Sequence, residues 1–311
     1  MLLRKTFWVL VALCLMIGAS TPVSAQVKLV RKFREGSTHS VEVATRLEQK
    51  LAIAGMDTET ESDTRTSVKV TVGKRDASGV LRIEEKVESL QISTKVQGTD
   101  YVFDSANPDK AGGGALEVMR PVHKALSGRT TTTTYDKDNK ITQIEFDQDV
   151  LNGLSEDIRK LVKGQLDPET LKKAANEEID RLPAEPVKTG DSWERTTNAN
   201  LGAGQIMRIA TRYTYDGEIE KDGRKLDRIV TKVLSTEFSL EADSPLPLTV
   251  KGSELKPAES RGELLFDREM GRVVSSTSFV QIVGDITFVI NNMELPSKLD
   301  LKIETTMQPR T

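Results

Sequence analysis

Residues 40–53 read SVEVATRLEQKLAI, and most apolar or β-branched residues in this segment occupy every second position. Successive side chains of a β-strand point to opposite faces, so this alternation predicts a strand with one buried face. This segment is far longer than a typical strand, which has about five or six residues. Strands this long bend or carry a bulge, and they are typical of curved sheets and barrels. The alternating residues are Val41, Val43, Thr45, Leu47, Leu51 and Ile53.

The same alternation recurs through the chain. Residues 68–72 continue it, Asp76–Gly79 form a turn, and residues 80–96 read as a second long strand. The alternation within this strand changes parity near Ser89 and Leu90, as a β-bulge would cause. Residues 299–307 alternate again near the other end. These segments predict a large, mostly antiparallel, meandering sheet.

Three segments have helical features. Pro121 and Gly128 are typical of the first position and the end of a short helix. Residues 151–162 have apolar residues at helical spacing, and we expect Gly164 to end that helix. A third helix should begin at Asp167-Pro168-Glu169, with its apolar face reaching Leu182. The sequence therefore predicts an α+β fold in which helices pack on the concave face of a curved antiparallel sheet.

The first 25 residues resemble a secretory signal peptide. Arg4 and Lys5 precede an apolar run from residue 7 to residue 17, and the segment ends in a small-x-small pattern at Ala25. We expect cleavage between Ala25 and Gln26 and a periplasmic or secreted bacterial protein without a transmembrane span in the mature chain. Cys14, the only cysteine, lies in the removed segment, so disulfides, cysteine nucleophiles and thiolate metal sites are not expected.

The predicted organisation divides the chain into four parts. These are the signal peptide (1–25), an N-terminal half with long strands and three helices (26–182), a connector (183–192) and a β-rich C-terminal half (193–311). The return strands at 81–87 and 226–233 follow similar turns, and later hairpins at 135–141 and 266–273 also correspond. Either an internal duplication or a simple β-meander explains these similarities.

Composition and motifs argue against several functions. The 44 basic and 47 acidic residues give no basic excess, which argues against nucleic-acid binding. His39 and His123 have no partner at metal-ligand or general-base spacing, so we expect structural or surface roles for both. We therefore predict no catalytic, cofactor-binding or metal-binding residue. Trp193 follows a turn at Gly190–Ser192, and it either anchors the core or contacts a ligand.

Several of these features together resemble a family of secreted bacterial proteins of unknown function. They are the signal peptide, the long strand after Gly36, the Ala125–Gly128 helix end and the connector from Leu182-Pro183 to Trp193. The resemblance implies a fold and a compartment but no activity. The layout is also weakly similar to the bacterial lipoprotein-carrier fold, a curved half-barrel sheet that wraps over helices and encloses an apolar cavity. Layout alone does not establish function.

Three hypotheses about function follow. The first is a non-catalytic envelope protein that binds a lipid or another hydrophobic molecule between sheet and helices, in a cavity lined by aliphatic side chains. The second is a scaffold module that binds another envelope protein through strand edges or an exposed apolar patch. The third is a hydrolase that uses two close carboxylates, at least one with a raised pKa. The ligand, and the residues that bind it, are not specified by the sequence.

Overall fold

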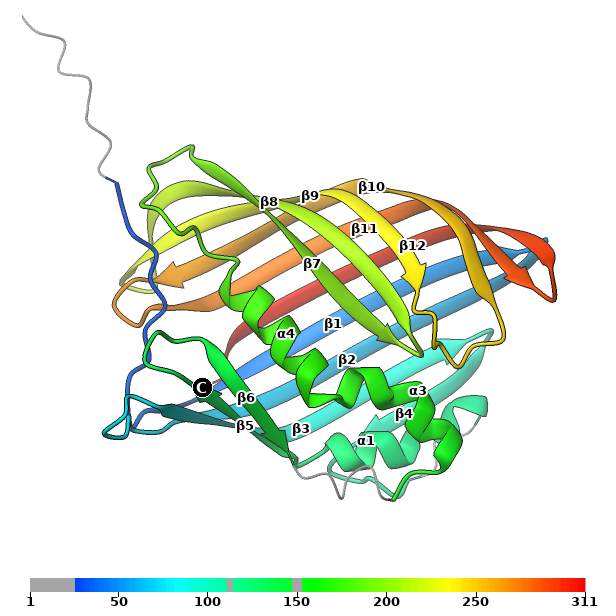
Figure 1. The fold of residues 1–311 in the computed structure, drawn as a ribbon, viewed down its shortest axis with the longest axis horizontal. Coiled ribbons are helices and arrows are strands. Elements are labelled where there is room, and N and C mark those ends of the chain that lie inside the picture. Colours follow the sequence, from blue (N-terminus) through cyan, green and yellow to red (C-terminus); the bar gives the residue numbers. More distant parts are fainter. Residues whose placement is uncertain (1–25, 111–113, 147–152, 311) are drawn as a thin grey trace, which may run out of the picture.

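A computed structural model describes residues 26–110, 114–146 and 153–310. Twelve antiparallel strands form one sheet, in the order β6-β5-β3-β2-β1-β12-β11-β10-β9-β8-β7, with β4 paired to β3 (Figure 1). The large antiparallel sheet expected from the alternation is therefore confirmed. The strands are β1 (Thr38–Ile53), β2 (Met56–Val72), β3 (Leu81–Val96), β4 (Thr99–Asp104), β5 (Thr130–Tyr135), β6 (Ile141–Phe146), β7 (Ser192–Gly202), β8 (Gln205–Lys221), β9 (Arg224–Leu240), β10 (Thr249–Asp267), β11 (Arg272–Ile290) and β12 (Met293–Arg310).

Two meanders meet in the middle of this sheet. Strands β1 to β6 run outward in one direction and β12 to β7 in the other, and β1 pairs with β12 from Ser40↔Arg310 to Ile53↔Ser297. The first and last strands of the chain therefore lie side by side at the centre. Both the 40–53 and the 299–307 segments that alternate in the sequence belong to this central pair.

The expected bulge is present. The β2–β3 register shifts between Ser67 and Val68, whose partners are Ser89 and Val87, so Glu88 is the extra residue. Its position is next to the parity change at Ser89-Leu90 in the sequence. Further register shifts occur in the β10–β11 and β8–β9 pairs, whereas β1 pairs with both neighbours without a shift.

Two helices begin where their capping residues predict, and the helix expected over 151–162 begins at Glu156 and ends later than expected. The helix α1 (Arg120–Leu126) has Pro121 in its first turn, and α4 (Pro168–Ile179) is capped by the Asp167 carboxylate, which accepts from Thr170 N at 2.7 Å. The helix α3 (Glu156–Leu166) continues through Gly164, so the predicted end there was wrong, and Leu151 lies outside the described residues. The next capping residue, Asp167, ends α3 instead. Leu182 follows α4 rather than extending it, and a 3₁₀ helix, η1 (Ala115–Met119), precedes α1.

The helix α4 spans the opening between the two sheet edges. It contacts both edge strands, β6 and β7, and in Figure 1 it crosses in front of the central strands. Its residues Leu171, Ala175 and Ile179 pack against a core that includes Tyr135 and Ile141 of the β5–β6 hairpin. Because one helix contacts both edges, the sheet must be strongly curled. The contacts of α3 and α4 with the sheet are contacts with its edge strands, and packing of helices on the concave face is not confirmed.

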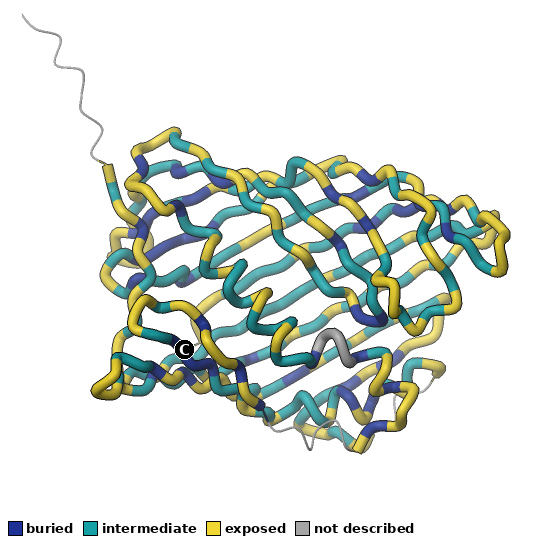
Figure 2. The backbone as a smooth tube through the Cα atoms, in the orientation of Figure 1, coloured by how far each residue is buried: buried dark blue, intermediate teal, exposed yellow. Residues whose placement is uncertain are grey.

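The curled sheet is filled at one end and hollow at the other. The largest core cluster gathers side chains of β8 to β12, among them Phe238, Ile282 and Leu301, with Leu47 and Leu51 of β1 against it. Yet none of the sixteen residues of β1 is fully buried, although this strand is central, and Figure 2 shows intermediate burial along the middle of the sheet. Part of the inner face therefore lines open space.

Candidate functional site

An internal hollow of about 490 Å³ lies at the end of the curled sheet where β1 begins. We call it the inner cavity. Its walls come from the ends of β1, β2, β3 and β5 on one side, from β7 to β12 on the other, and from the end of α4 and the N-terminal segment 31–37. Pockets of about 300–1,000 Å³ typically hold small molecules. Much of its lining is aliphatic and includes Val41, Val70, Val72, Ile83, Ile229 and Leu264.

An aromatic wall stands on the β7–β8 side of the inner cavity. Trp193 stacks on Tyr213 with ring centroids 5.8 Å apart and an interplanar angle of 12°, and its Nε1 donates to the Arg181 carbonyl oxygen at 2.7 Å. Trp193 packs against the neighbouring core cluster and also lines the cavity. The two roles left open by the sequence are thus not exclusive, because the side chain is anchored and still faces the hollow.

Several charged side chains also line the inner cavity. Arg31 lies with Cζ 5.5 Å from the centroid of the Phe33 ring, and Arg181 forms an ion pair with Glu178. Arg272 has Nη2 3.8 Å from Met270 Sδ. No ion pair within 4.0 Å joins Arg31 or Arg272 to a described carboxylate, but Arg31 lowers the pKa of Glu85 and Asp267 raises that of Arg272, so each has an acidic group at longer range.

The surroundings shift the pKa values of these groups. Burial lowers the pKa of His39 to about 4, with Arg272 acting in the same direction, so His39 is neutral at pH 7. Burial also lowers the pKa of Arg272. Burial raises the pKa of Glu85, and the nearby Arg31 opposes that shift. The Glu85 side chain borders the cavity and is exposed to solvent.

The N-terminal segment closes one wall of the cavity. The backbones of Val27 and Val187 exchange two hydrogen bonds of 2.8 Å, Lys32 N donates to Gly271 O at 2.9 Å, and Gly36 N donates to Val72 O at 2.9 Å. Residues 26–37 thus run from the connector before β7, past the β10–β11 turn, to the end of β2. We call this segment the N-terminal strap.

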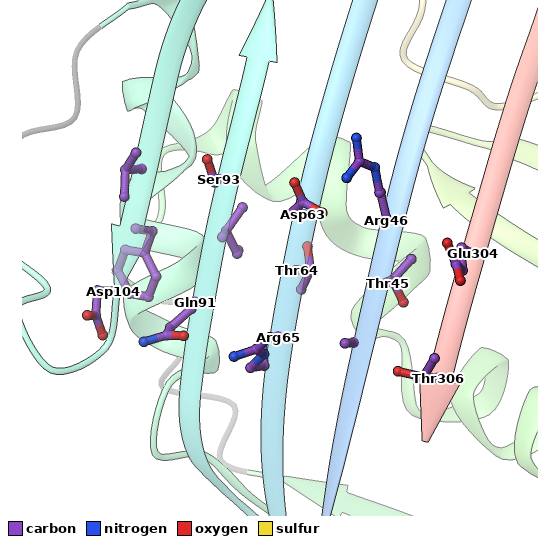
Figure 3. Close-up of a pocket in the computed structure, with 14 residues that line it drawn as sticks. Thr45, Arg46, Asp63, Thr64, Arg65, Gln91, Ser93, Asp104, Glu304 and Thr306 are labelled. Atoms are coloured by element: carbon purple, nitrogen blue, oxygen red, sulfur yellow. The ribbon is translucent and has the colours of Figure 1, made fainter. Parts of the chain in front are cut away.

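A second hollow of about 400 Å³ lies on the outer face of the sheet (Figure 3). Strand register places its side chains in two neighbouring rows, which are Glu304–Arg46–Asp63–Ser93 and Thr306–Ala44–Arg65–Gln91. Acidic and basic groups alternate along the first row. This outer groove is polar and shallow, and it resembles the solvated face of any half-exposed sheet.

The two histidines do not meet. His39 lines the inner cavity, whereas Nδ1 of His123 in α1 is 2.7 Å from the Tyr101 hydroxyl, and the His123 ring lies 5.5 Å from Phe103. His123 is thus part of the core beside β4, as a structural role requires. Across residues 26–110, 114–146 and 153–310, no group of three or more His, Cys, Asp or Glu side chains is arranged to hold a metal ion.

The predicted cleavage site stays a prediction. Gln26 is the first described residue, and Ala25 and the segment before it lie outside the described residues. Within the described part of the chain, no helix is long and apolar enough to cross a membrane.

Sequence comparison leads to a family without a known function. Residues 78–224 match the model of a family of unknown function (DUF6263). This range runs from the turn before β3 to the start of β9. The resemblance to an uncharacterised family is therefore confirmed. None of the curated proteins matches the chain in sequence.

Comparison with solved structures gives distant similarities. Lipovitellin, in a structure describing its lipid–protein interactions, aligns with 90% of this chain at 10% identity and a TM-score of 0.42, and the aligned part is 26% of lipovitellin. The chain thus spans about a quarter of lipovitellin. A DUF1329 family protein from Desulfovibrio piger aligns over 84% of this chain and 83% of its own at 7% identity and a TM-score of 0.14. An outer membrane channel from Pseudomonas putida F1 aligns over 90% and 98% at 8% identity and a TM-score of 0.25.

Proposed function

We propose that this protein is an exported, non-catalytic binding protein that holds a hydrophobic ligand in the inner cavity. The observation that carries the proposal is a hollow of about 490 Å³ with aliphatic and aromatic walls inside the curled sheet. Burial of apolar ligand surface stabilises a complex by about 25 cal/mol per Å². An apolar ligand would also cover cavity-lining side chains such as Val41 and Met307 that are only half-buried in the free chain.

The two other hypotheses from the sequence receive less support. The scaffold hypothesis expects an exposed apolar patch in place of a cavity, whereas this structure has a cavity. The large apolar side chains exposed among the described residues are Val30, Met56, Val102, Val118, Leu201, Val230 and Met293. The hydrolase hypothesis requires a second free carboxylate beside Glu85. Glu178 is the other acidic residue lining the inner cavity among those described, and Arg181 engages it.

The proposal is tested by identifying what the native protein carries. Protein purified from the organism that makes it is measured by native mass spectrometry, and any bound molecule is extracted with solvent and identified. We expect a stoichiometric hydrophobic adduct. A ligand-free mass, together with no saturable uptake of a hydrophobic fluorescent dye by the purified chain, would rule the proposal out.

A variant that fills the hollow provides the control. Ser276 lines the inner cavity from β11, opposite Met307 of β12, so Ser276→Phe should place a ring inside it. Thr277, the next residue, points to the other face and is exposed, which makes Thr277→Phe the matched substitution. We expect Ser276→Phe to weaken dye binding at least tenfold and Thr277→Phe to leave it within twofold.

A further inference from the structure

We propose that the ligand is a single-chain amphiphile with an anionic head group, and that Arg31 and Arg272 bind this head group. The inference rests on the proposed function, because it specifies the chemical class of the molecule held in the inner cavity. It depends on three features: the position of the two guanidinium groups, the charge balance of the lining and the cavity volume.

The two arginines belong to segments that touch. Lys32 N donates to Gly271 O at 2.9 Å, which joins the strap residue after Arg31 to the residue before Arg272. The charge of Arg31 also acts on Arg181: burial lowers the pKa of Arg181, and the Arg31 charge lowers it further. Arg31 of the strap, Arg272 of β11 and Arg181, which follows α4, therefore line the same cavity.

The charges of the lining do not balance. Five cationic side chains and two anionic ones line the inner cavity, with His39 neutral; of the cations, Arg31, Arg181 and Arg272 are partly buried, whereas Lys32 and Arg34 are exposed. Partly buried charges are normally paired, because removing an ion from water costs free energy. The Arg31 guanidinium lies over the Phe33 ring and that of Arg272 near the Met270 sulfur, while their acidic neighbours, Glu85 and Asp267, act on them from beyond 4.0 Å. A carboxylate or phosphate head group would supply a direct counter-charge through bidentate hydrogen bonds. The cations are Arg31, Lys32, Arg34, Arg181 and Arg272, and the anions are Glu85 and Glu178.

The cavity volume limits the apolar part to one chain. A dry cavity of about 150 Å³ binds one benzene molecule, so about 490 Å³ holds roughly three groups of that size, or on the order of eighteen carbon atoms. One acyl chain has about this size, whereas two chains would exceed it. The aliphatic side chains Val41, Val70 and Leu264 would contact the chain, with the head group toward the strap.

The test compares twelve-carbon probes that differ only in their head group. Dodecanoate, dodecyl phosphate, dodecanol and dodecylammonium are titrated into the full mature chain at pH 8 by calorimetry, below their aggregation concentrations. We expect the two anions to bind at least tenfold more tightly than dodecanol, and dodecylammonium to bind most weakly. The ranking of the two anions separates a carboxylate from a phosphate source.

Arginine variants connect that preference with the two side chains. Arg31→Gln and Arg272→Gln should each weaken dodecanoate binding about tenfold, since hydrogen bonds in which both partners are charged are stronger than neutral ones. Both should leave dodecanol affinity within twofold. Arg65→Gln removes the same charge from the outer groove and should change neither affinity (Figure 3). The thermal stability of Arg272→Gln should stay close to that of the parent, because burial disfavours the Arg272 charge and Asp267 only partly offsets this cost.

The outcomes separate the two proposals. Binding of no probe overturns the proposed function itself. Equal binding of all four probes, or tightest binding of dodecylammonium, leaves a hydrophobic site in place but overturns the anionic head group. Loss of dodecanol and dodecanoate binding together in both arginine variants, with reduced stability, assigns these arginines a structural role and also overturns the inference.

Discussion

At the scale of single residues, the buried carboxylate of Asp227 connects strands in the second half of the sheet. It is 1% exposed, it accepts from the Tyr215 hydroxyl at 2.7 Å, and its other oxygen accepts from Arg268 Nε at 2.6 Å. Burial and the bond to Asp227 raise the pKa of Tyr215, which keeps the hydroxyl protonated as a donor.

Loss of this carboxylate should destabilise the fold. In Asp227→Asn an amide group would face the Arg268 donor, so we expect the free energy of unfolding to fall by about 3 kcal/mol. Tyr215→Phe removes one of the two bonds and should cost about 1–2 kcal/mol. Urea unfolding measures both effects, and Asp243→Asn at an exposed position is the control. Equal stability of Asp227→Asn and Asp243→Asn would contradict this role.

The two histidines should make stability depend on pH. Burial lowers the pKa of His39 and of His123 to about 4, from about 6.5 in an unfolded chain. Between these values the unfolded state takes up protons that the folded state does not, so stability falls as the pH drops from about 6.5 toward 4. Both rings are partly hydrated, and we expect a loss of about 1–2 kcal/mol for each.

A histidine-free variant isolates this effect from that of the carboxylates. Urea midpoints at pH 7.5 and pH 4.5 are compared for the parent and for the double variant His39→Gln, His123→Gln. The parent should lose more stability on acidification than the variant. Parallel losses in the two proteins would show that neither ring resists protonation.

At the scale of elements, long strands tolerate a side chain at some glycines and not at others. Gly284 of β11 has φ +149, and a Cβ there would collide with the carbonyl oxygen of Glu254 on β10. Gly252, also on β10, has no other atom within 4 Å of such a Cβ. We expect Gly284→Ala to lower the free energy of unfolding by about 1–3 kcal/mol and Gly252→Ala to leave it nearly unchanged. A similar effect of the two substitutions on chemical unfolding would refute the close β10–β11 approach.

The secondary-structure elements are the feature of this molecule that the sequence predicts best. Period-two alternation located β1 and β12, the parity change near Ser89 located the bulge at Glu88 to within a residue, and Asp167-Pro168 located the start of α4. These signals are local, since each depends on neighbours within one strand or one turn. The end of α3 was missed because a glycine that should stop a helix was outweighed by the stronger cap that follows it.

At the scale of the whole molecule, the sequence alone could not predict which residues line the cavity. Its lining comes from segments far apart along the chain, among them those that hold Arg31, Glu85, Ile179, Trp193 and Arg272. These segments line one cavity only because the sheet curls until α4 contacts both edges. No residue among them carries a motif. In the sequence Trp193 stands out by following a turn signal, whereas Arg31 and Arg272 resemble ordinary surface charges among the 44 basic residues. The two arginines line one cavity only because the sheet curls.

That closed shape should control how fast a ligand leaves. The strap is attached to the connector by the Val27–Val187 pair, and Val27→Pro removes the Val27 N–H donor while keeping an extended backbone. We expect ligand release to accelerate several-fold, measured by stopped-flow displacement of a fluorescent fatty acid, with little change in far-ultraviolet circular dichroism. Lys28→Pro is the matched control, because the Lys28 N–H makes no hydrogen bond among the described residues and its side chain is exposed. If both variants release ligand at the parent rate, the strap does not control ligand exit and the prediction fails.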